Sequence, residues 1–253
     1  MIAILVAAAQ ALFVNEQGLP VSTSKERIEH DLIRWYIPKS SCGVLELGAR
    51  YGTSSCAIAK HLNTSSRAVS VEAMPETWSA LEHNLRNHSC NGHLVRGVVS
   101  TQPLVRENWR SGSIYTTRFV PADHPSALKR AANDSFSPAF TPAQLERQYG
   151  LQFDAMVADC EGCFESVIDS FPHFVARLNT LILEGDNGIG WQKKGVGTVN
   201  YSSIVKRLDA SGLALVKSFP HPCCRVAGYN LIVMMVFQRR RVNSTDPEVS
   251  SCS

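Results

Sequence analysis

The sequence predicts an α/β fold in which helices cover both faces of a mostly parallel sheet, forming a three-layer sandwich. Short apolar runs at residues 42–48, 67–73 and 153–159 have the composition of strands buried on both faces. Segments with apolar residues at helical spacing lie between the runs, and this alternation is typical of βαβ units. Two further β-rich runs, at 213–219 and 229–238, predict an antiparallel strand pair at the C-terminal end.

The remaining elements follow from the same spacing rules. Residues 93–100 and 179–184 predict the other two strands of the parallel part. Thr23 to Glu26 has the pattern of a capping box, and Pro38 ends the helix that follows it. Pro75 suits the first turn of a second helix, because proline lacks the N–H that a helix start leaves unpaired. The complete set of predicted helices is 27–37, 53–62, 75–87, 142–149, 161–178 with a break at Pro172, and 201–210.

The chain of 253 residues fits one domain, 1–253, with three additions. Residues 1–38 form an N-terminal extension whose first 14 residues are apolar, too short to span a bilayer and without a basic start. Both a packed helix and an export or anchor segment fit them, so membrane association stays open. Residues 101–150 are rich in Ser, Pro, Arg and Asn and predict an insertion with one strand at 114–120. Residues 242–253 predict a frayed, flexible tail.

Composition narrows the function classes. The net charge of +3 is small and gives no sign of the clustered Lys and Arg that a nucleic-acid surface needs. The basic run from Arg239 to Arg241 suits the solvated end of a last strand. Eight cysteines and five Asn-x-Ser/Thr sequons tilt toward an oxidising compartment, whereas reduced core cysteines would fit the cytoplasm. The sequence therefore leaves open a cytoplasmic or a secretory, membrane-associated location, and it does not define the oligomeric state.

Two predicted strands end in residues that suit a nucleotide-like ligand. Gly48 and Gly52 follow the first strand and permit a tight turn with close backbone approach. Glu72 ends the second strand, where an acid can accept hydrogen bonds from both hydroxyls of a ribose. Ligands of such sheets bind outside the carboxyl ends of the strands, so this edge predicts the cofactor site.

The loop between the glycines indicates which cofactor. Its residues Ala49, Arg50 and Tyr51 interrupt the Gly-x-Gly-x-x-Gly pattern of a dinucleotide site. Glu46 lies two residues before Gly48 and could reach, directly or through water, the amino-acid part of S-adenosylmethionine. This cofactor carries an ammonium and a sulfonium and no phosphate, so an acid-rich loop suits it better than an anion-binding nest.

The stretch DCEGCFE, residues 159–165, follows the fourth strand. Asp159 at the strand end is expected beside the first strand, where it could orient an acceptor or take its proton. Glu161 and Glu165 are four residues apart and predict one face of a helix start, and a carboxylate in a first turn also suits the helix dipole. For Cys160 and Cys163, zinc binding together with Cys223 and Cys224, a disulfide, and free core thiols are all possible; free thiols are favoured.

Several motifs together resemble the FkbM-type family of methyltransferases. They are VLELGARYG, VSVEAMPETWSALEHNLRNH, and FDAMVADCEGCFESVI followed by LILEGD. The family's Asp-x-Glu-Gly-x-x-Glu signature falls on Asp159, Glu161, Gly162 and Glu165, and its later strand-end acid falls on Glu184. Val157 stands where family members often carry Lys, and Arg50 where they often carry Asn.

The resemblance implies a class I, Rossmann-like fold and S-adenosylmethionine as cofactor. It implies O-methylation of a hydroxyl on a sugar, a glycan or a small natural product, whereas the expectation of no nucleic-acid partner rests on the charge distribution. The residues expected to bind the cofactor are Glu46, Gly48, Ala49, Tyr51, Gly52, Glu72, Ala73 and Asp159.

Methyl transfer requires an acceptor held in line with the sulfonium and a group that removes the acceptor proton. Asp159 is the hypothesised base, assisted by Glu161 or Glu184, and His221 is the alternative base. Asp186 and Trp191 could line the mouth of the acceptor site. A divalent cation on Asp159, Glu161 and Glu184 is possible but not favoured, and no metal site is predicted. A catalytically silent binding module and a nucleotide-dependent oxidoreductase are the alternative functions.

Overall fold

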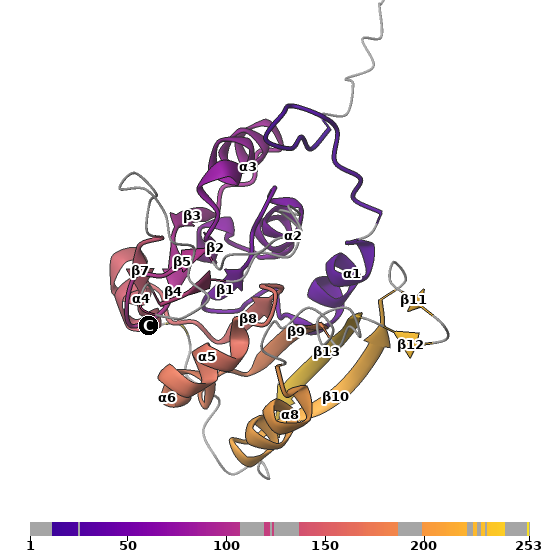
Figure 1. Cartoon of the computed structure of the whole chain (residues 1–253), viewed down its shortest axis with the longest axis vertical. Helices are drawn as coiled ribbons and strands as arrows, with labels where there is room; N and C mark the ends of the chain where they lie inside the picture. The colour runs from indigo at the N-terminus through magenta and orange to yellow at the C-terminus, as the bar shows by residue number, and fades with distance from the viewer. Residues whose placement is uncertain are drawn as a thin grey trace, which may run out of the picture.

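The computed structural model describes residues 12–24, 26–106, 119–121, 123, 137–186, 199–221, 225–226, 229–230, 232–240 and 252. At its centre lies a seven-stranded sheet with the strand order β10-β13-β9-β8-β1-β2-β3 (Figure 1). The strands are β1 (Val44–Leu47), β2 (Ala68–Glu72), β3 (His93–Arg96), β8 (Ala155–Ala158), β9 (Thr180–Asp186), β10 (Leu213–Pro220) and β13 (Ile232–Arg239).

Five neighbouring strands, from β3 to β9, run parallel. Strand β13 lies between β9 and β10 and is antiparallel to both. This confirms the predicted class I, Rossmann-like fold, a mostly parallel sheet that ends in an antiparallel strand pair. The carboxyl ends of β1, β2, β8 and β9 therefore meet at one edge of the sheet, where the sequence predicts the site.

Helices cover both faces of the sheet, and each face has its own apolar core (Figure 1). One core holds buried residues of the first three helices, such as Leu32, Ile58 and Leu81; the other holds Leu145, Phe164 and Ile204. The helices of the first face are α1 (Arg27–Tyr36), α2 (Thr53–His61) and α3 (Pro75–Asn87), and those of the second are α4 (Pro142–Tyr149), α5 (Phe164–Ser170), α6 (Pro172–Val175) and α8 (Tyr201–Ala210). A single 3-10 turn, η1 (Ser65–Arg67), precedes β2.

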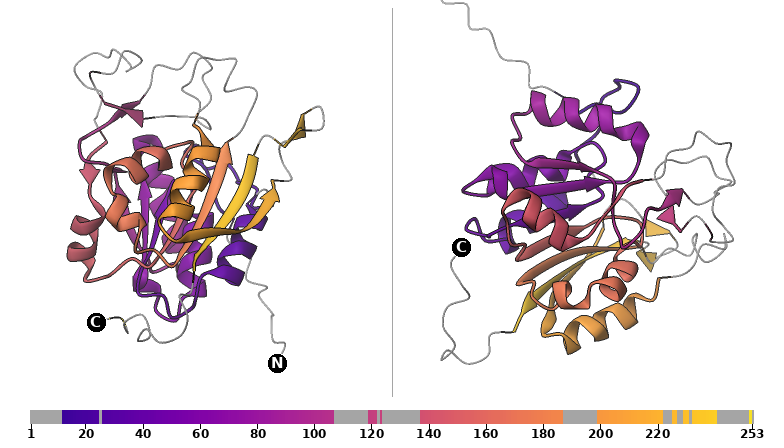
Figure 2. Two further views of the ribbon diagram at one scale, coloured as in Figure 1. Left: turned by 90° about the horizontal axis from the view of Figure 1, so that it is seen from below. Right: turned by 90° about the vertical axis from the view of Figure 1, so that its left-hand side faces the viewer.

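Three small ladders accompany the main sheet. Their strands are β4 (Val98–Val99) with β7 (Ala139–Phe140), β5 (Val105–Arg106) with β6 (Phe119–Val120), and β11 (Arg225–Val226) with β12 (Tyr229–Asn230). The β5–β6 and β11–β12 ladders lie beyond the carboxyl ends of the parallel strands (Figure 2). Of the strand predicted at 114–120, only residues 119–120 are described and are a strand; 114–118 lie outside the described residues.

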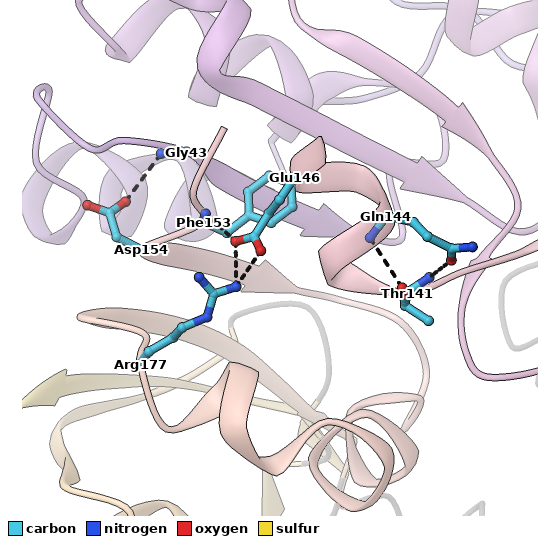
Figure 3. A network of polar contacts seen from close by, with 7 residues as sticks. All are labelled: Gly43, Thr141, Gln144, Glu146, Phe153, Asp154 and Arg177. Atoms are coloured by element: carbon cyan, nitrogen blue, oxygen red, sulfur yellow. Dashed lines mark hydrogen bonds and ion pairs between the residues drawn. The ribbon is translucent and has the colours of Figure 1, made fainter. Parts of the chain in front are cut away.

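Helix α4 carries part of a network of polar contacts that also includes Phe153 and Arg177 (Figure 3). It starts with a capping box in which the Thr141 side chain accepts from the Gln144 N–H, while the Gln144 side chain accepts from the Thr141 N–H. Glu146 accepts a hydrogen bond from the Phe153 N–H at 2.8 Å and pairs with Arg177. The end of the predicted insertion is thus a helix that Glu146 links to Phe153, before β8, and to Arg177, after α6.

Two predicted helix starts are wrong. The Thr23–Glu26 segment makes no side-chain cap, and α1 begins after Glu26, whose own side chain supplies no capping hydrogen bond. The helix expected from residue 161 begins only at Phe164, because residues 160–163 form a turn. Glu161 and Glu165 therefore do not share a helix face. The stop before Pro38 and the break at Pro172 are confirmed.

The preference for free thiols is also wrong. Each cysteine in the described part of the chain is in a disulfide, and the pairs are Cys42–Cys252, Cys56–Cys90 and Cys160–Cys163. Cys223 and Cys224 lie outside the described residues, as do residues 1–11. In the tail that was predicted to be frayed, Cys252 forms a disulfide with Cys42, two residues before β1. Among the described helices, none is long and apolar enough to cross a bilayer.

Candidate cofactor and active site

A cavity of ≈ 760 Å³ opens at the carboxyl ends of β1, β2, β8 and β9. Of the residues that the sequence assigns to a site, those lining this cavity are Gly48, Tyr51, Glu72, Ala73, Asp159, Glu161, Glu184 and the alternative base His221. Glu46, Ala49 and Gly52 are not among the described residues that line it. Asp186 ends β9, and Trp191 lies outside the described residues.

The loop after β1 is pressed against the end of β8. Gly48 has φ +90°, and a Cβ on it would lie 1.7 Å from the Asp159 carbonyl oxygen, so no side chain fits there. The Gly48 and Ala49 N–H groups donate to the Val71 carbonyl at 3.0 and 3.2 Å. The loop is therefore fixed between β2 and β8. Glycine is needed at position 48 because the loop backbone lies against the backbone of Asp159, and not only because a ligand approaches it.

Gly52 serves packing on the far side of the loop. It has φ +83°, and a Cβ there would lie 2.8 Å from the Leu81 Cδ1 atom of α3. Gly52 is the N-cap residue of α2.

Glu72 is the fixed carboxylate of the site. It is 5% exposed, and its two oxygens accept the Arg50 N–H at 2.6 Å and the Met74 N–H at 2.7 Å. Burial raises the pKa of Glu72, while these backbone N–H groups act in the opposite direction. The two loops thus hold the carboxylate at the cavity wall, and its remaining lone pairs can accept hydroxyl donors of a ligand. The residues present therefore fit a ribose.

Glu46 lies behind the loop, next to α2. It is 2% exposed and accepts a hydrogen bond from the Ser55 hydroxyl at 2.6 Å. Burial raises its pKa to about 7, and the negative charge of Asp159 contributes in the same direction. The predicted direct contact with a cofactor is not supported by this position.

Asp159 and Glu184 bring two acids together at the tips of neighbouring strands. Burial raises the pKa of Asp159 to about 6, while Arg50 and a hydrogen bond with the Glu184 side chain oppose the shift. A carboxyl group with a pKa near the working pH can accept a proton and release it again. In the described residues no group of three or more His, Cys, Asp or Glu side chains is arranged to hold a metal ion.

Glu26, the N-cap of α1, and Glu29, in its first turn, complete the floor of the cavity, and the sequence reasoning missed both. Glu29 is 4% exposed, and its pKa is raised by burial and by the charges of Asp159, Glu26 and Glu46. Burial likewise raises the pKa of Glu26 to about 7. The signal was present, because Glu29 precedes the inward-facing Leu32 and Ile33 by three and four residues and so shares their helix face.

The N-terminal segment closes one side of the cavity. The Asn84 amide donates to the carbonyl oxygens of Val14 and Tyr51, both at 2.8 Å, and its oxygen accepts the Val14 N–H at 3.0 Å. The Tyr51 hydroxyl donates to Glu16 at 2.5 Å. These bonds place Asn15 and residues 20–22 in the cavity wall.

The described wall is strongly acidic. Among the described residues that line the cavity, Arg50 is the only Lys or Arg. The carboxylates that line the cavity are Glu26, Glu29, Glu72, Asp159, Glu161, Glu165, Asp169 and Glu184. Such a wall favours cationic groups and opposes phosphate.

Comparison with known proteins adds structural similarity only. No family model matches the chain, and neither does any curated protein. Among solved structures, the chain is similar to an O-methyltransferase from Bacillus cereus in complex with SAH (11% identity, TM-score 0.49, 87% of this chain and 82% of that one). It is also similar to precorrin-6y C5,15-methyltransferase from Geobacter metallireducens (11%, 0.47, 90% and 98%). A third is fibrillarin from Aeropyrum pernix with natively bound S-adenosyl-L-methionine (14%, 0.44, 83% and 74%). At this level of similarity, function has to be argued from the site itself.

Proposed function

We propose that the protein is an S-adenosylmethionine-dependent methyltransferase. The observation that carries the proposal is Glu72, a buried carboxylate at the end of β2 that both neighbouring loops hold at the cavity wall. An acid at this place accepts hydrogen bonds from ribose hydroxyls. Ala73, Met74, Val98 and Val99 provide an adjoining, largely apolar wall that suits an adenine ring.

The charge of the cavity favours this cofactor over a dinucleotide. The ammonium of its methionine part and its sulfonium would lie near Glu26, Glu29 and Asp159, and a nearby cation favours the ionised form of these carboxyl groups, whose pKa values burial raises. A pyrophosphate would meet the same carboxylates and would lack the glycine pattern that presents N–H groups to it. These features argue against a nucleotide-dependent oxidoreductase.

We further propose O-methylation of a hydroxyl on a sugar, a glycan or a small natural product, in line with the FkbM-type resemblance. The three acids of the signature, Asp159, Glu161 and Glu165, all line the cavity. Val157, at the position where family members often carry Lys, is 1% exposed in β8 and packs in the apolar core. The acidic wall suits a neutral polyhydroxylated acceptor and opposes a nucleic acid.

When bound, S-adenosylmethionine supplies an electrophilic methyl group. Asp159 accepts the proton of the acceptor hydroxyl, because a pKa of about 6 leaves it mostly ionised at neutral pH and still basic enough for the task. Glu184 holds the Asp159 carboxylate in place through their hydrogen bond. The N-terminal segment held by Asn84 and the Gly48 loop close one side of the site.

Calorimetric titration of the full chain with S-adenosylmethionine, S-adenosylhomocysteine and NAD tests the cofactor. Both adenosyl compounds are expected to bind, and NAD is not. Glu72→Gln should weaken S-adenosylhomocysteine binding by about tenfold or more, the cost of a weakened charge-assisted hydrogen bond. Glu82→Gln, on the exposed face of α3, is the matched control and should bind as the unchanged protein does. Binding of NAD alone would refute the proposal.

Transfer of labelled methyl groups to a mixture of sugars and small hydroxylated compounds tests the reaction. Asp159→Asn should still bind S-adenosylhomocysteine through Glu72, Glu26 and Glu29, and should lose most of the turnover, by about a hundredfold for a general base. Full turnover in this variant would show that Asp159 is not the base. Binding without transfer to any hydroxylated compound would favour a silent binding module.

A further inference from the structure

Two cysteines in the cavity wall have no part in the proposed reaction. Cys160 and Cys163 are disulfide bonded, line the cavity and are both partly exposed. The Cys56–Cys90 pair, in contrast, is buried, with 3% and 5% of the two residues exposed. A reductant that enters the cavity can therefore reach the first pair without unfolding the protein.

The disulfide joins the two ends of a tight turn. The Cys160 carbonyl accepts the Cys163 N–H at 3.1 Å, and the two residues between them have positive φ, +55° at Glu161 and +84° at Gly162. Gly162 adopts this conformation readily. Glu161 does not, and a non-glycine residue remains left-handed only where its surroundings hold it there. The covalent link across the turn is such a restraint.

The same turn is packed against the cofactor loop. An ideal Cβ on Gly48 would lie 1.7 Å from the Asp159 carbonyl oxygen and 3.4 Å from the Cys160 Cα atom. On the other side, a Cβ on Gly162 would lie 2.6 Å from the Val199 side chain, just before α8. A rearrangement of residues 160–163 therefore displaces the floor on which the Gly48 loop rests.

We propose that Cys160–Cys163 is a thiol–disulfide exchange site for a dithiol reductant, and that the oxidised form is the one competent to bind cofactor. One thiolate of the reductant attacks a protein sulfur, and the bond between the two protein sulfurs breaks. The second thiolate of the reductant then attacks the reductant sulfur of the mixed disulfide, and the bond from that sulfur to the protein breaks. The protein gains two electrons and two protons as two thiols, and the reductant becomes a disulfide. Reduction frees Glu161 from the turn and loosens the Gly48 loop. The effect of reduction on cofactor binding rests on the proposed function.

The experiment is a titration of the oxidised full chain with dithiothreitol, with thiols trapped and mapped by mass spectrometry. Cys160–Cys163 should open at a lower dithiothreitol concentration than Cys56–Cys90. Amide hydrogen exchange of residues 160–163 should then rise while far-ultraviolet circular dichroism stays unchanged. The affinity for S-adenosylhomocysteine should fall by about fivefold or more, the lower range for coupled sites.

Two double variants separate this site from the other accessible pair. The variant with both Cys160→Ser and Cys163→Ser should show fast amide hydrogen exchange at residues 160–163 and weak S-adenosylhomocysteine binding without any reductant. Added dithiothreitol should change neither property. Cys42→Ser with Cys252→Ser, which removes the disulfide at the other end of β1, should keep the response.

Three results would overturn the inference. The thiol–disulfide exchange site is wrong if Cys160–Cys163 opens only at the dithiothreitol concentration that opens the buried pair. The coupling of the disulfide to the turn is wrong if the disulfide opens with no change in amide hydrogen exchange of residues 160–163. The coupling to the cofactor is wrong if both redox forms bind S-adenosylhomocysteine equally. If neither form binds it while the thiols and the exchange behave as expected, the redox site stands and the methyltransferase proposal fails.

Discussion

Glu46 offers a test of the buried charges that is independent of any ligand. Its pKa is raised by burial from 4.5 to about 7. A carboxyl group whose pKa is higher in the folded state stabilises the fold fully below its unfolded pKa, and loses that contribution as pH rises through the folded pKa. Between pH 4.5 and about 7, ionisation of Glu46 should therefore cost about 3 kcal/mol of stability, at about 1.4 kcal/mol for each pKa unit.

Glu46→Gln removes the charge and keeps an oxygen for the Ser55 hydroxyl. At pH 8.5 the variant should be more stable than the unchanged protein by about 3 kcal/mol, which raises Tm by roughly 6–12 °C for a chain of this size. At pH 5 the two proteins should agree within about 1 kcal/mol. Urea and thermal unfolding at both pH values, with Glu82→Gln as a surface control, measure the difference. A Glu46→Gln protein that is less stable at pH 8.5, or that tracks the unchanged protein at both pH values, refutes the reasoning.

Two further substitutions test the walls of the cavity. Gly48→Ala places a Cβ against the Asp159 carbonyl and should abolish S-adenosylhomocysteine binding in calorimetry; Gly150→Ala, also at positive φ but with no atom within 4 Å of the new Cβ, is the matched control and should keep it. Equal loss in both variants would assign the effect to φ alone. Asn84→Ala removes three hydrogen bonds of a fully buried amide and should lower the free energy of unfolding by about 3 kcal/mol in urea. A change below about 0.5 kcal/mol, the scale of surface substitutions, would show that Asn84 does not hold the N-terminal segment in place.

Much of the site was predictable because its residues follow directly on buried strands. The apolar runs around Leu45, Val69 and Met156 define strands by composition alone, and the residue after such a run lies at the carboxyl edge of the sheet. Glu72, Asp159 and the Gly48 loop were found in this way, although Glu46, inside the strand, was assigned a contact that its buried position does not support.

The sequence by itself determined the alternation of strands and helices, because the spacing of apolar residues reports which face of each element is buried. Only the tertiary structure decided which distant segments meet. The Cys42–Cys252 and Cys56–Cys90 pairs and the approach of Glu29 on α1 to Asp159 depend on contacts between segments far apart in the chain. Local patterns carry no record of those contacts, since they are set by strand order and packing rather than by neighbouring residues.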